Sequence, residues 1–330
     1  MAEWLYEAGI GETRAALVED GAIVEARIER DDEGPRVGAV VAARLVEAGR
    51  GGKGALAQLD WPGEPAAMLT GLPRATSTGA RIIVEITRMA LSERGRDKPA
   101  RARMAEPGAP LGDGPDLAAQ IAASGLPVAT LHPAGSDRLE EAGWSELIDN
   151  VRTGHWAFAG GALWVDATPA MVLIDIDGEG DPLALARTGA AEAAAVIRRC
   201  GIGGSIGIDF PSLPGRAERQ AIDAAVDTAL PPPFERTAVN GFGFMQIVRR
   251  RDRASLIEQI CLDPVRTDAA LLLRQGERAT GTGTLTLTAR PAVIDHIAAR
   301  PDWIDLLQQR SGRAVRLAAD AAVKGTGHAQ

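Results

Sequence analysis

The chain has 330 residues, a hydrophobic content of 45% and a formal net charge of −8, and its length suffices for two or three domains with their own cores. No apolar run approaches the ~20 residues of a membrane-spanning helix, and the first residues lack the basic start and apolar core of a signal peptide. The two cysteines, Cys200 and Cys261, have no paired spacing, which argues against a disulfide framework. We therefore expect a cytoplasmic protein without a membrane partner.

The first third of the chain predicts β-structure. Residues 4–30 alternate between apolar and polar positions around Glu19-Asp20-Gly21, a pattern typical of a hairpin. Several short apolar runs separated by Gly-rich turns follow between residues 37 and 87, and they predict a small barrel. The Pro- and Gly-rich stretch 104–115 then indicates a linker.

Positive charge is concentrated in two segments of this acidic chain. Arg88–Arg103 holds six basic residues against two acidic ones, and Arg249–Arg253 follows the strand-like sequence FGFMQIV. Charge runs of this kind are typical of solvated surface. They also provide what a nucleic-acid phosphate backbone requires, so both interpretations stay open here.

Helical and strand patterns alternate in the rest of the chain. Residues 116–153 predict helices with one short strand at 126–131, and residues 162–165 predict a strand. The C-terminal part predicts a strand at 284–288, helices at 292–299 and 303–309, a strand at 314–317, and a loose tail at 324–330.

A strand–helix–strand unit lies in the centre of the sequence. The runs MVLIDID (171–177) and GSIGIDF (204–210) are short, apolar and rich in Ile, as expected of buried parallel strands. Between them, Asp181 suits an N-cap, Pro182 a first helical position, and Gly201 follows the predicted helix. A crossover of this length joins adjacent parallel strands.

Two aspartates, Asp175 and Asp209, stand near the ends of these two strands, so we expect both carboxylates at one edge of the sheet. Asp177 lies two residues beyond Asp175 and therefore points to the same side. Neighbouring carboxylates repel unless a cation separates them, and Mg²⁺ prefers such oxygen ligands. Helix capping is the alternative role for strand-end aspartates.

The central sequence resembles the ribonuclease E/G family. The resemblance is carried by FAGGALWVDATPAMVLIDIDG (158–178), GGSIGIDFPSL (203–213) and FERTAVNGFGFMQIVRRR (234–251), whose order and spacing agree with that family. Weaker similarity extends to the first predicted hairpin, to the position of the barrel, and to LTARPAVIDHIAARPDWIDLL (287–307).

The resemblance implies an α/β (α+β mixed) multidomain protein with an OB-type β-barrel inserted in a ribonuclease-H-like layer. A catalytic α/β domain and a small C-terminal α/β domain would follow. The expected segments are 1–36 for the N-terminal hairpin of the layer, 37–104 for the RNA-binding barrel and basic segment, 105–168 for the linker and the rest of the layer, 169–262 for the catalytic domain, and 263–330 for the small domain.

The resemblance also implies a Mg²⁺-dependent endoribonuclease, with Mn²⁺ as an alternative ion, that cleaves single-stranded or processing-intermediate RNA to 5′-phosphate and 3′-hydroxyl ends. Asp175 and Asp209 would bind the metal, while Asp177 would replace the family's Asn and orient a ligand or a bound water. The alternatives are a catalytically weak or inactive RNA-binding relative and a phosphodiesterase that acts on smaller substrates.

Further residues are RNA-binding candidates by their place in the resemblance: Lys98, Arg101, Arg103, Trp61, Asn240, Arg249, Arg250 and Arg251. Trp61 would stack on a base, although a packing role beside Pro62 is equally compatible with the sequence.

The chain also departs from the family pattern. Gly241 replaces a basic residue, and Cys261 stands alone where the family has a zinc-binding pair, so we expect no zinc and no zinc-linked tetramer. The segment that senses an RNA 5′ end has no counterpart here. A homodimer is the oligomeric state expected by analogy.

Overall fold

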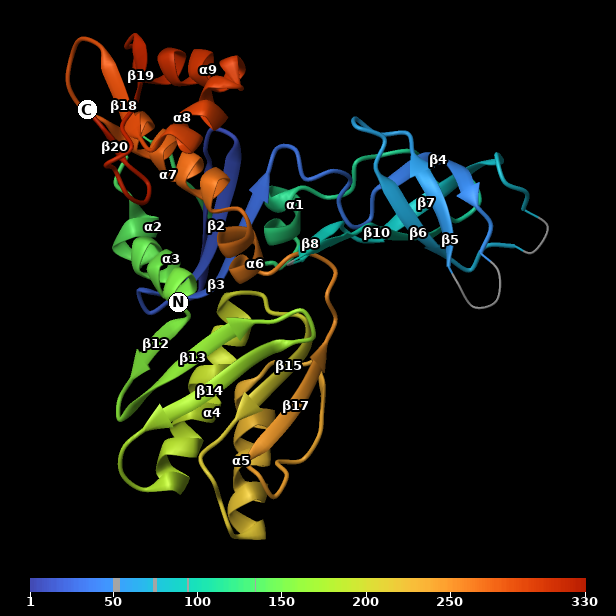
Figure 1. The fold of residues 1–330 in the computed structure, drawn as a ribbon, viewed down its shortest axis with the longest axis vertical. Helices are drawn as coiled ribbons and strands as arrows, with labels where there is room; N and C mark the ends of the chain where they lie inside the picture. Colours follow the sequence, from blue (N-terminus) through green and yellow to red (C-terminus); the bar gives the residue numbers. More distant parts are fainter. Residues whose placement is uncertain (50–53, 74–75, 94, 134) are drawn as a thin grey trace. The chain divides into compact units, whose positions relative to one another are not determined.

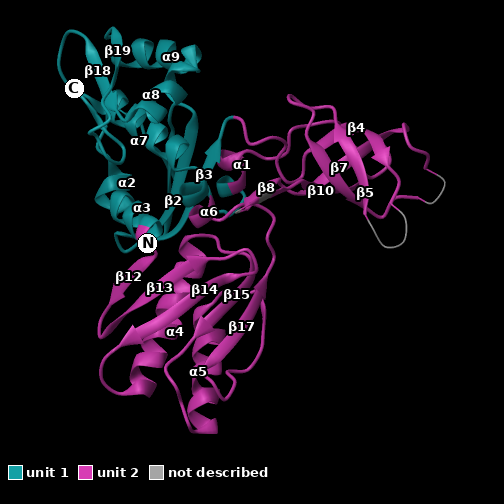
Figure 2. Cartoon of the chain, viewed as in Figure 1, with its two compact units in different colours: residues 1–31, 121–152, 259–330 teal, residues 32–120, 153–258 magenta. Residues whose placement is uncertain are grey.

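The structure is a computed structural model that describes residues 1–49, 54–73, 76–93, 95–133 and 135–330. The chain forms two compact units, each assembled from separate stretches of sequence (Figure 2). Unit 1 comprises residues 1–31, 121–152 and 259–330, and unit 2 comprises residues 32–120 and 153–258.

The N-terminal sheet of unit 1 has the strand order β11-β1-β2-β3. Its strands are β1 (Glu3–Ala8), β2 (Glu12–Glu19), β3 (Ala22–Arg30) and β11 (Val128–Thr130). The predicted turn is present between β2 and β3, where Asp20 and Gly21 both have positive φ, as two-residue hairpin turns require. The first arm of the expected hairpin is itself two antiparallel strands, because the chain turns again between Ala8 and Glu12.

Helices and a second, three-stranded sheet complete unit 1 (Figure 1). The helices of unit 1 are α2 (Arg138–Glu141), α3 (Trp144–Thr153), α7 (Pro264–Arg278), α8 (Pro291–Ala298) and α9 (Pro301–Ser311). Two further helices, α1 (Leu117–Ala122) and α6 (Leu256–Leu262), begin in unit 2 and end in unit 1. The second sheet has the order β19-β18-β20, with β18 at Leu285–Ala289, β19 at Val315–Ala319 and β20 at His328–Ala329. The prediction of a loose tail at 324–330 is therefore wrong for the last residues. Strand β20 pairs with β18, and the Gln330 carbonyl accepts a hydrogen bond from Thr286 N at 2.7 Å.

A closed barrel forms the first part of unit 2, which confirms the predicted small barrel. Its strands are β4 (Val40–Glu47), β5 (Ala55–Leu59), β6 (Ala66–Thr70), β7 (Arg81–Arg88) and β10 (Ala100–Met104). Their order is β10-β6-β5-β4-β7, and the interior is filled by alanine and branched aliphatic side chains such as Ala57, Leu69 and Val84. A two-stranded ribbon, β8 (Leu91–Glu93) and β9 (Arg96–Lys98), lies between β7 and β10 in the sequence.

The second part of unit 2 is a six-stranded sheet with the order β12-β13-β14-β15-β17-β16. The strands are β12 (His155–Phe158), β13 (Gly161–Ala167), β14 (Val172–Gly178), β15 (Gly204–Asp209), β16 (Glu235–Arg236) and β17 (Phe244–Arg249). Only β14 and β15 run parallel, and helix α4 (Pro182–Arg199) connects them as predicted. The Asp181 carboxylate caps α4 by accepting a hydrogen bond from Ala184 N at 2.8 Å.

One face of this sheet is covered by α4 and α5 (Arg216–Ala229), and the other face carries exposed side chains (Figure 1). Strand β14 shows this alternation, since Val172, Ile174 and Ile176 are buried whereas Asp175 and Asp177 are exposed. The expectation that β14 and β15 are buried on both faces is therefore wrong. We call the exposed side the open face of the sheet.

Within the described parts of the chain, no helix is both long enough and apolar enough to cross a membrane.

Candidate metal and nucleic-acid site

The two aspartates singled out in the sequence are neighbours on the open face. Asp175 of β14 and Asp209 of β15 are cross-strand partners in the parallel register, and both side chains are exposed. Strands pair about 4.8 Å apart, so these carboxylates project side by side. Asp177 stands two residues further along β14 on the same face.

Their position differs from the expected one in one respect. Asp209 is the last residue of β15, but Asp175 lies in the middle of β14, where β13 continues the sheet on its far side. The acids therefore lie on the surface of the sheet, near the end of β15, and not at a common edge of the two strands. They are exposed there because the helices cover only the opposite face of the sheet.

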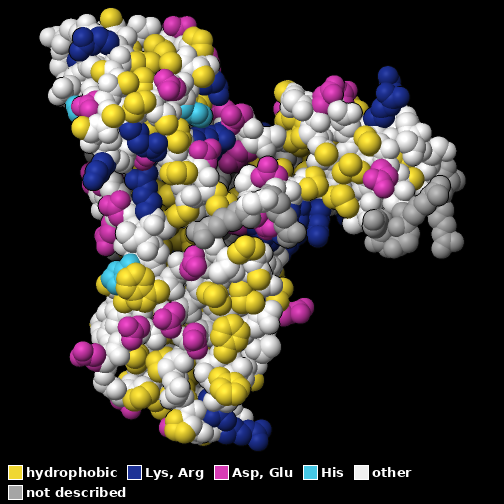
Figure 3. Space-filling view, viewed as in Figure 1, with side chains coloured by type: hydrophobic (Ala, Val, Ile, Leu, Met, Phe, Trp, Pro, Cys, Tyr) yellow, Lys and Arg dark blue, Asp and Glu magenta, His cyan; other side chains and the backbone are white. Residues whose placement is uncertain are grey.

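A row of residues crosses the open face through the acid pair. The pairing registers place His155 of β12, Trp164 of β13, Asp175, Asp209 and Phe244 of β17 opposite one another in turn. The row thus has two aromatic rings on one side of the acids and one ring on the other. Acidic and hydrophobic side chains lie together on this face (Figure 3).

The rings of this row differ in their exposure. Trp164 is 50% exposed, and its ring centroid lies 4.6 Å from that of His155 at an interplanar angle of 53°. Phe244 is half-buried, because its ring packs over Gly207, where an added Cβ would lie only 2.5 Å from the ring. Trp164 therefore offers the more accessible ring face next to Asp175.

The acids influence one another electrostatically. Partial burial and the negative charges of Asp209 and Asp177 raise the pKa of Asp175 above its usual value, although the Ile176 backbone N–H opposes this. Asp177 accepts a hydrogen bond from Gly178 N at 2.9 Å, which leaves its second oxygen for other donors or a cation. A divalent cation at this position would relieve the repulsion that the three carboxylates create.

The donor chemistry fits a hard cation, since three carboxylates on one surface supply the oxygen ligands that Mg²⁺ prefers. Among the residues that the structure describes, no three His, Cys, Asp or Glu side chains already form a metal-binding group. Because the side chains of Asp175, Asp177 and Asp209 are exposed, their carboxylates can reorient around an ion without displacing packed neighbours.

The loop before β17 closes one end of the row. The Asn240 side-chain oxygen accepts hydrogen bonds from Phe242 N at 2.8 Å and from Phe244 N at 3.1 Å. Asn240, one of the RNA-binding candidates, therefore stabilises this turn. Gly243 accepts a hydrogen bond from Phe210 N at 3.0 Å, which fastens the loop beside Asp209. Phe242 at the loop tip is 87% exposed.

Two of the basic candidates are engaged with the same carboxylate. Lys98 Nζ donates to Glu93 at 2.5 Å, and Arg251 Nη1 donates to Glu93 at 2.8 Å while its Nη2 bonds Glu258. Burial alone would raise the pKa of Glu93, but the hydrogen bonds and positive charges of Lys98 and Arg251 lower it to about 2. Ion pairs of this kind occupy both side chains.

The other basic candidates are more accessible. Arg103 is exposed and pairs with Glu85 at 2.8 Å, Arg101 is exposed on the same strand, and Arg250 lies 3.8 Å from Asp252 at the surface. Arg249 donates to the Ile202 carbonyl at 3.2 Å.

Register separates the Arg249–Arg251 cluster from the acids. Arg249 pairs with Gly204, five residues before Asp209 on β15, which is roughly 17 Å along the strand. The structure therefore brings Asp175, Asp177 and Asp209 together but does not add Arg249 to them.

Trp61 is half-buried against the barrel core, as its packing interpretation expects. Sequence reasoning missed Trp164, His155 and Phe244. A usable signal was present in GALWVDA, because Trp164 lies between the buried Leu163 and Val165 and so must point to the opposite face.

No protein-family model matches the chain, and a search of curated proteins finds no match to it.

Proposed function

We propose that the protein is a Mg²⁺-dependent endoribonuclease that acts on single-stranded RNA at the open face of the six-stranded sheet. The observation that carries the proposal is the register of Asp175 against Asp209, with Asp177 on the same face. The sequence resemblance to the ribonuclease E/G family supports the same assignment, including an OB-type barrel, a ribonuclease-H-like layer and products with 5′-phosphate and 3′-hydroxyl ends.

In this proposal Asp175 and Asp209 hold the metal ion, and Asp177 orients a ligand through its second oxygen. A bound Mg²⁺ would activate a water and offset negative charge on the phosphate. The protein's own contribution is to gather three carboxylates whose mutual repulsion favours a cation, as the raised pKa of Asp175 reflects. Mn²⁺ can take the same oxygen ligands.

The aromatic rings favour a nucleic acid strand over a small phosphodiester. Trp164 and His155 flank the acids on one side and Phe244 on the other, and the exposed Phe242 precedes Phe244 by two residues in the chain. Aromatic side chains stack on the unpaired bases of single-stranded RNA without regard to sequence. An RNA strand that runs along the row would place bases on the rings while a phosphate lies at the acids.

The test is incubation of the purified protein with end-labelled single-stranded RNA and Mg²⁺, alongside the variant Asp209→Asn. We expect internal cuts that EDTA abolishes and that Asp209→Asn reduces roughly 100-fold or more. Asp166→Asn is the matched control, because Asp166 is an exposed acid on the same face outside the row. It should cut at the wild-type rate.

The outcomes separate three functions. Binding of RNA without cuts would indicate a non-catalytic RNA-binding protein, for which the glycine at 241 in place of a basic residue is the motivating observation. Hydrolysis of small phosphodiesters without action on RNA would indicate a phosphodiesterase. Cutting that persists in Asp209→Asn would overturn the assignment of the site.

A further inference from the structure

A cavity of about 230 Å³ lies within unit 1, whereas the acids of the six-stranded sheet belong to unit 2. Its lining includes Arg14 of β2, Asp137 at the start of α2, Trp144 at the start of α3, and Arg274 and Arg278 of α7. The cavity exceeds by several-fold the ~30 Å³ that one water molecule occupies in the liquid, so it has room for a small polyatomic ion.

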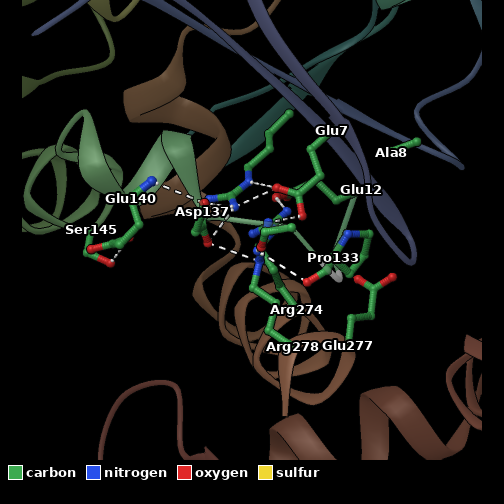
Figure 4. Close-up of polar contacts among 12 residues, drawn as sticks. Glu7, Ala8, Glu12, Pro133, Asp137, Glu140, Ser145, Arg274, Glu277 and Arg278 are labelled. Atoms are coloured by element: carbon green, nitrogen blue, oxygen red, sulfur yellow. Dashed lines mark hydrogen bonds and ion pairs between the residues drawn. The ribbon is translucent and has the colours of Figure 1, made fainter. Parts of the chain in front are cut away.

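Among the described residues, three carboxylates line this cavity, those of Asp137, Glu140 and Asp149, and the first two accept hydrogen bonds, as does the neighbouring Glu7. Asp137 accepts from Arg14 at 3.1 Å and lies 3.0 Å from Arg278, and the neighbouring Glu7 accepts from Arg14 at 2.6 Å and from Arg278 at 2.9 Å. Glu140, which also lines the cavity, accepts from Ser145 Oγ at 2.8 Å. Figure 4 shows the carboxyl groups of Glu7 and Asp137 among these basic side chains.

Some of the buried N–H donors around the cavity, in contrast, have no acceptor among the described residues. Arg274 is only 6% exposed, and its Nε and Nη1 have no hydrogen-bond acceptor among the described residues. Its Nη2 reaches Glu12 at 3.4 Å, but Glu12 is also shared with Arg30 at 3.1 Å. Trp144 is 1% exposed, and its Nε1 likewise has no acceptor in the described part of the chain.

The positive charges of Arg14 and Arg274 also favour an anion in the cavity. Burial and the nearby charge of Arg274 lower the pKa of Arg14, although Glu7 and Asp137 oppose this. The buried guanidinium of Arg274 is the costly one, because it has lost its hydration without gaining a full set of acceptors.

We propose that this cavity is a binding site for a small tetrahedral oxyanion of the phosphate or sulfate class, held by Arg274 and by the indole N–H of Trp144. Guanidinium groups suit such anions, since their planar donors match oxyanion geometry and carry charge. This inference does not depend on the proposed nuclease activity, since the cavity and the acid row belong to different units.

The test uses the full-length protein and inorganic phosphate as the probe. Isothermal titration calorimetry and thermal unfolding should show binding and a rise in melting temperature with phosphate and with sulfate, relative to chloride at equal ionic strength. Arg274→Met keeps an unbranched apolar stem and removes the guanidinium donors. We expect about 10- to 100-fold weaker phosphate binding in this variant, since hydrogen bonds to charged groups contribute that much.

Arg27→Met is the matched control. Arg27 also belongs to unit 1 and pairs with an acid, Glu25 at 2.6 Å, as Arg274 pairs with Glu12 at 3.4 Å, but Arg27 does not line the cavity. This variant should bind phosphate as the wild type does. Trp144→Phe provides a second variant that keeps an aromatic ring but removes the indole N–H together with part of the ring, and it should weaken binding several-fold.

Absence of phosphate and sulfate binding by the wild type would overturn the proposal, as would wild-type affinity in a folded Arg274→Met protein. If Arg274→Met does not fold, unchanged affinity in Trp144→Phe overturns it instead. Acetate is the comparison ligand, and binding of acetate without phosphate would show a carboxylate site and exclude the tetrahedral class. Loss of RNA cleavage in Asp209→Asn bears only on the nuclease proposal and leaves this site unaffected.

Discussion

At the scale of single residues, Asp175 shows how neighbours on a sheet alter a side chain. Its pKa is raised by partial burial and by Asp209 and Asp177, so the folded state disfavours its charged form. A raised pKa means that the stabilising contribution of Asp175 is present at low pH and is lost as the pH rises through the folded-state value.

We therefore predict that Asp175→Asn is more stable than the wild type at pH 7 without divalent cations. The gain should be less than about 1 kcal/mol, because exposed charges are screened by solvent and salt. Urea unfolding between pH 3.5 and pH 7 measures it, and the difference should vanish toward the acid end. Mg²⁺ should then stabilise the wild type more than the variant, and equal stabilisation of both would argue against metal binding at Asp175.

Trp164 supports a second prediction at this scale. Trp164→Leu removes an exposed ring beside Asp175, so affinity for single-stranded RNA measured in EDTA should fall about 5- to 100-fold. Fluorescence anisotropy with a labelled RNA gives the affinity. Trp164→Phe should retain most of the binding, and Val248→Ser, which changes a 46% exposed residue of β17 outside the row, should retain all of it. Equal affinities for Trp164→Leu and the wild type would remove Trp164 from the site.

At the scale of elements, the loop between β16 and β17 has no room for a side chain at Gly243 but has free space at Gly241. Gly243 has a φ of 90°, and a Cβ there would lie 2.5 Å from the Phe210 carbonyl oxygen, so a side chain is not tolerated. Two residues earlier, a Cβ added to Gly241 would have no heavy atom within 4 Å.

Gly241→Arg should therefore introduce a basic residue without loss of stability, within about 0.5 kcal/mol. We expect tighter binding to single-stranded RNA and a steeper salt dependence, by about 0.7 in the slope of log affinity against log salt for one added phosphate contact. Titrations at several NaCl concentrations measure this slope. Gly241→Gln is the control that adds length without charge, and a slope that Gly241→Arg leaves unchanged would place residue 241 away from the RNA.

At the scale of the whole molecule, each unit is built from stretches that lie far apart in the sequence. Unit 1 is completed by the last residues of the chain, because β20 adds the outer strand next to β18. Thr326 also donates to Asp268 at 3.3 Å, and Asp268 pairs with Arg152 and Arg290.

Deletion of residues 326–330 should consequently lower the free energy of unfolding of unit 1 by about 1–3 kcal/mol, through the loss of several hydrogen bonds. Hydrogen exchange at β18 measures the effect locally. Protection of the barrel strands β4 and β7 serves as the internal control, and unchanged exchange at Thr286 would contradict the role of β20.

Sequence alone determined the features that depend on local chemistry. The Asp20-Gly21 turn, the capped helix after Asp181 and the shared face of Asp175 and Asp177 follow from backbone conformation and side-chain period. The barrel and the parallel β14–β15 pair were also predictable, because runs of apolar residues and turn signals mark their strands.

Tertiary structure decided everything that depends on which segments meet. The exposure of one face of β14, the row from His155 to Phe244, the strand formed by residues 328–329 and the unbalanced donors of Arg274 all require partners distant in the sequence. Local periodicity indicates which face of a strand a residue occupies. Strand register and packing between distant segments choose its neighbours, and those neighbours set its charge, burial and chemistry.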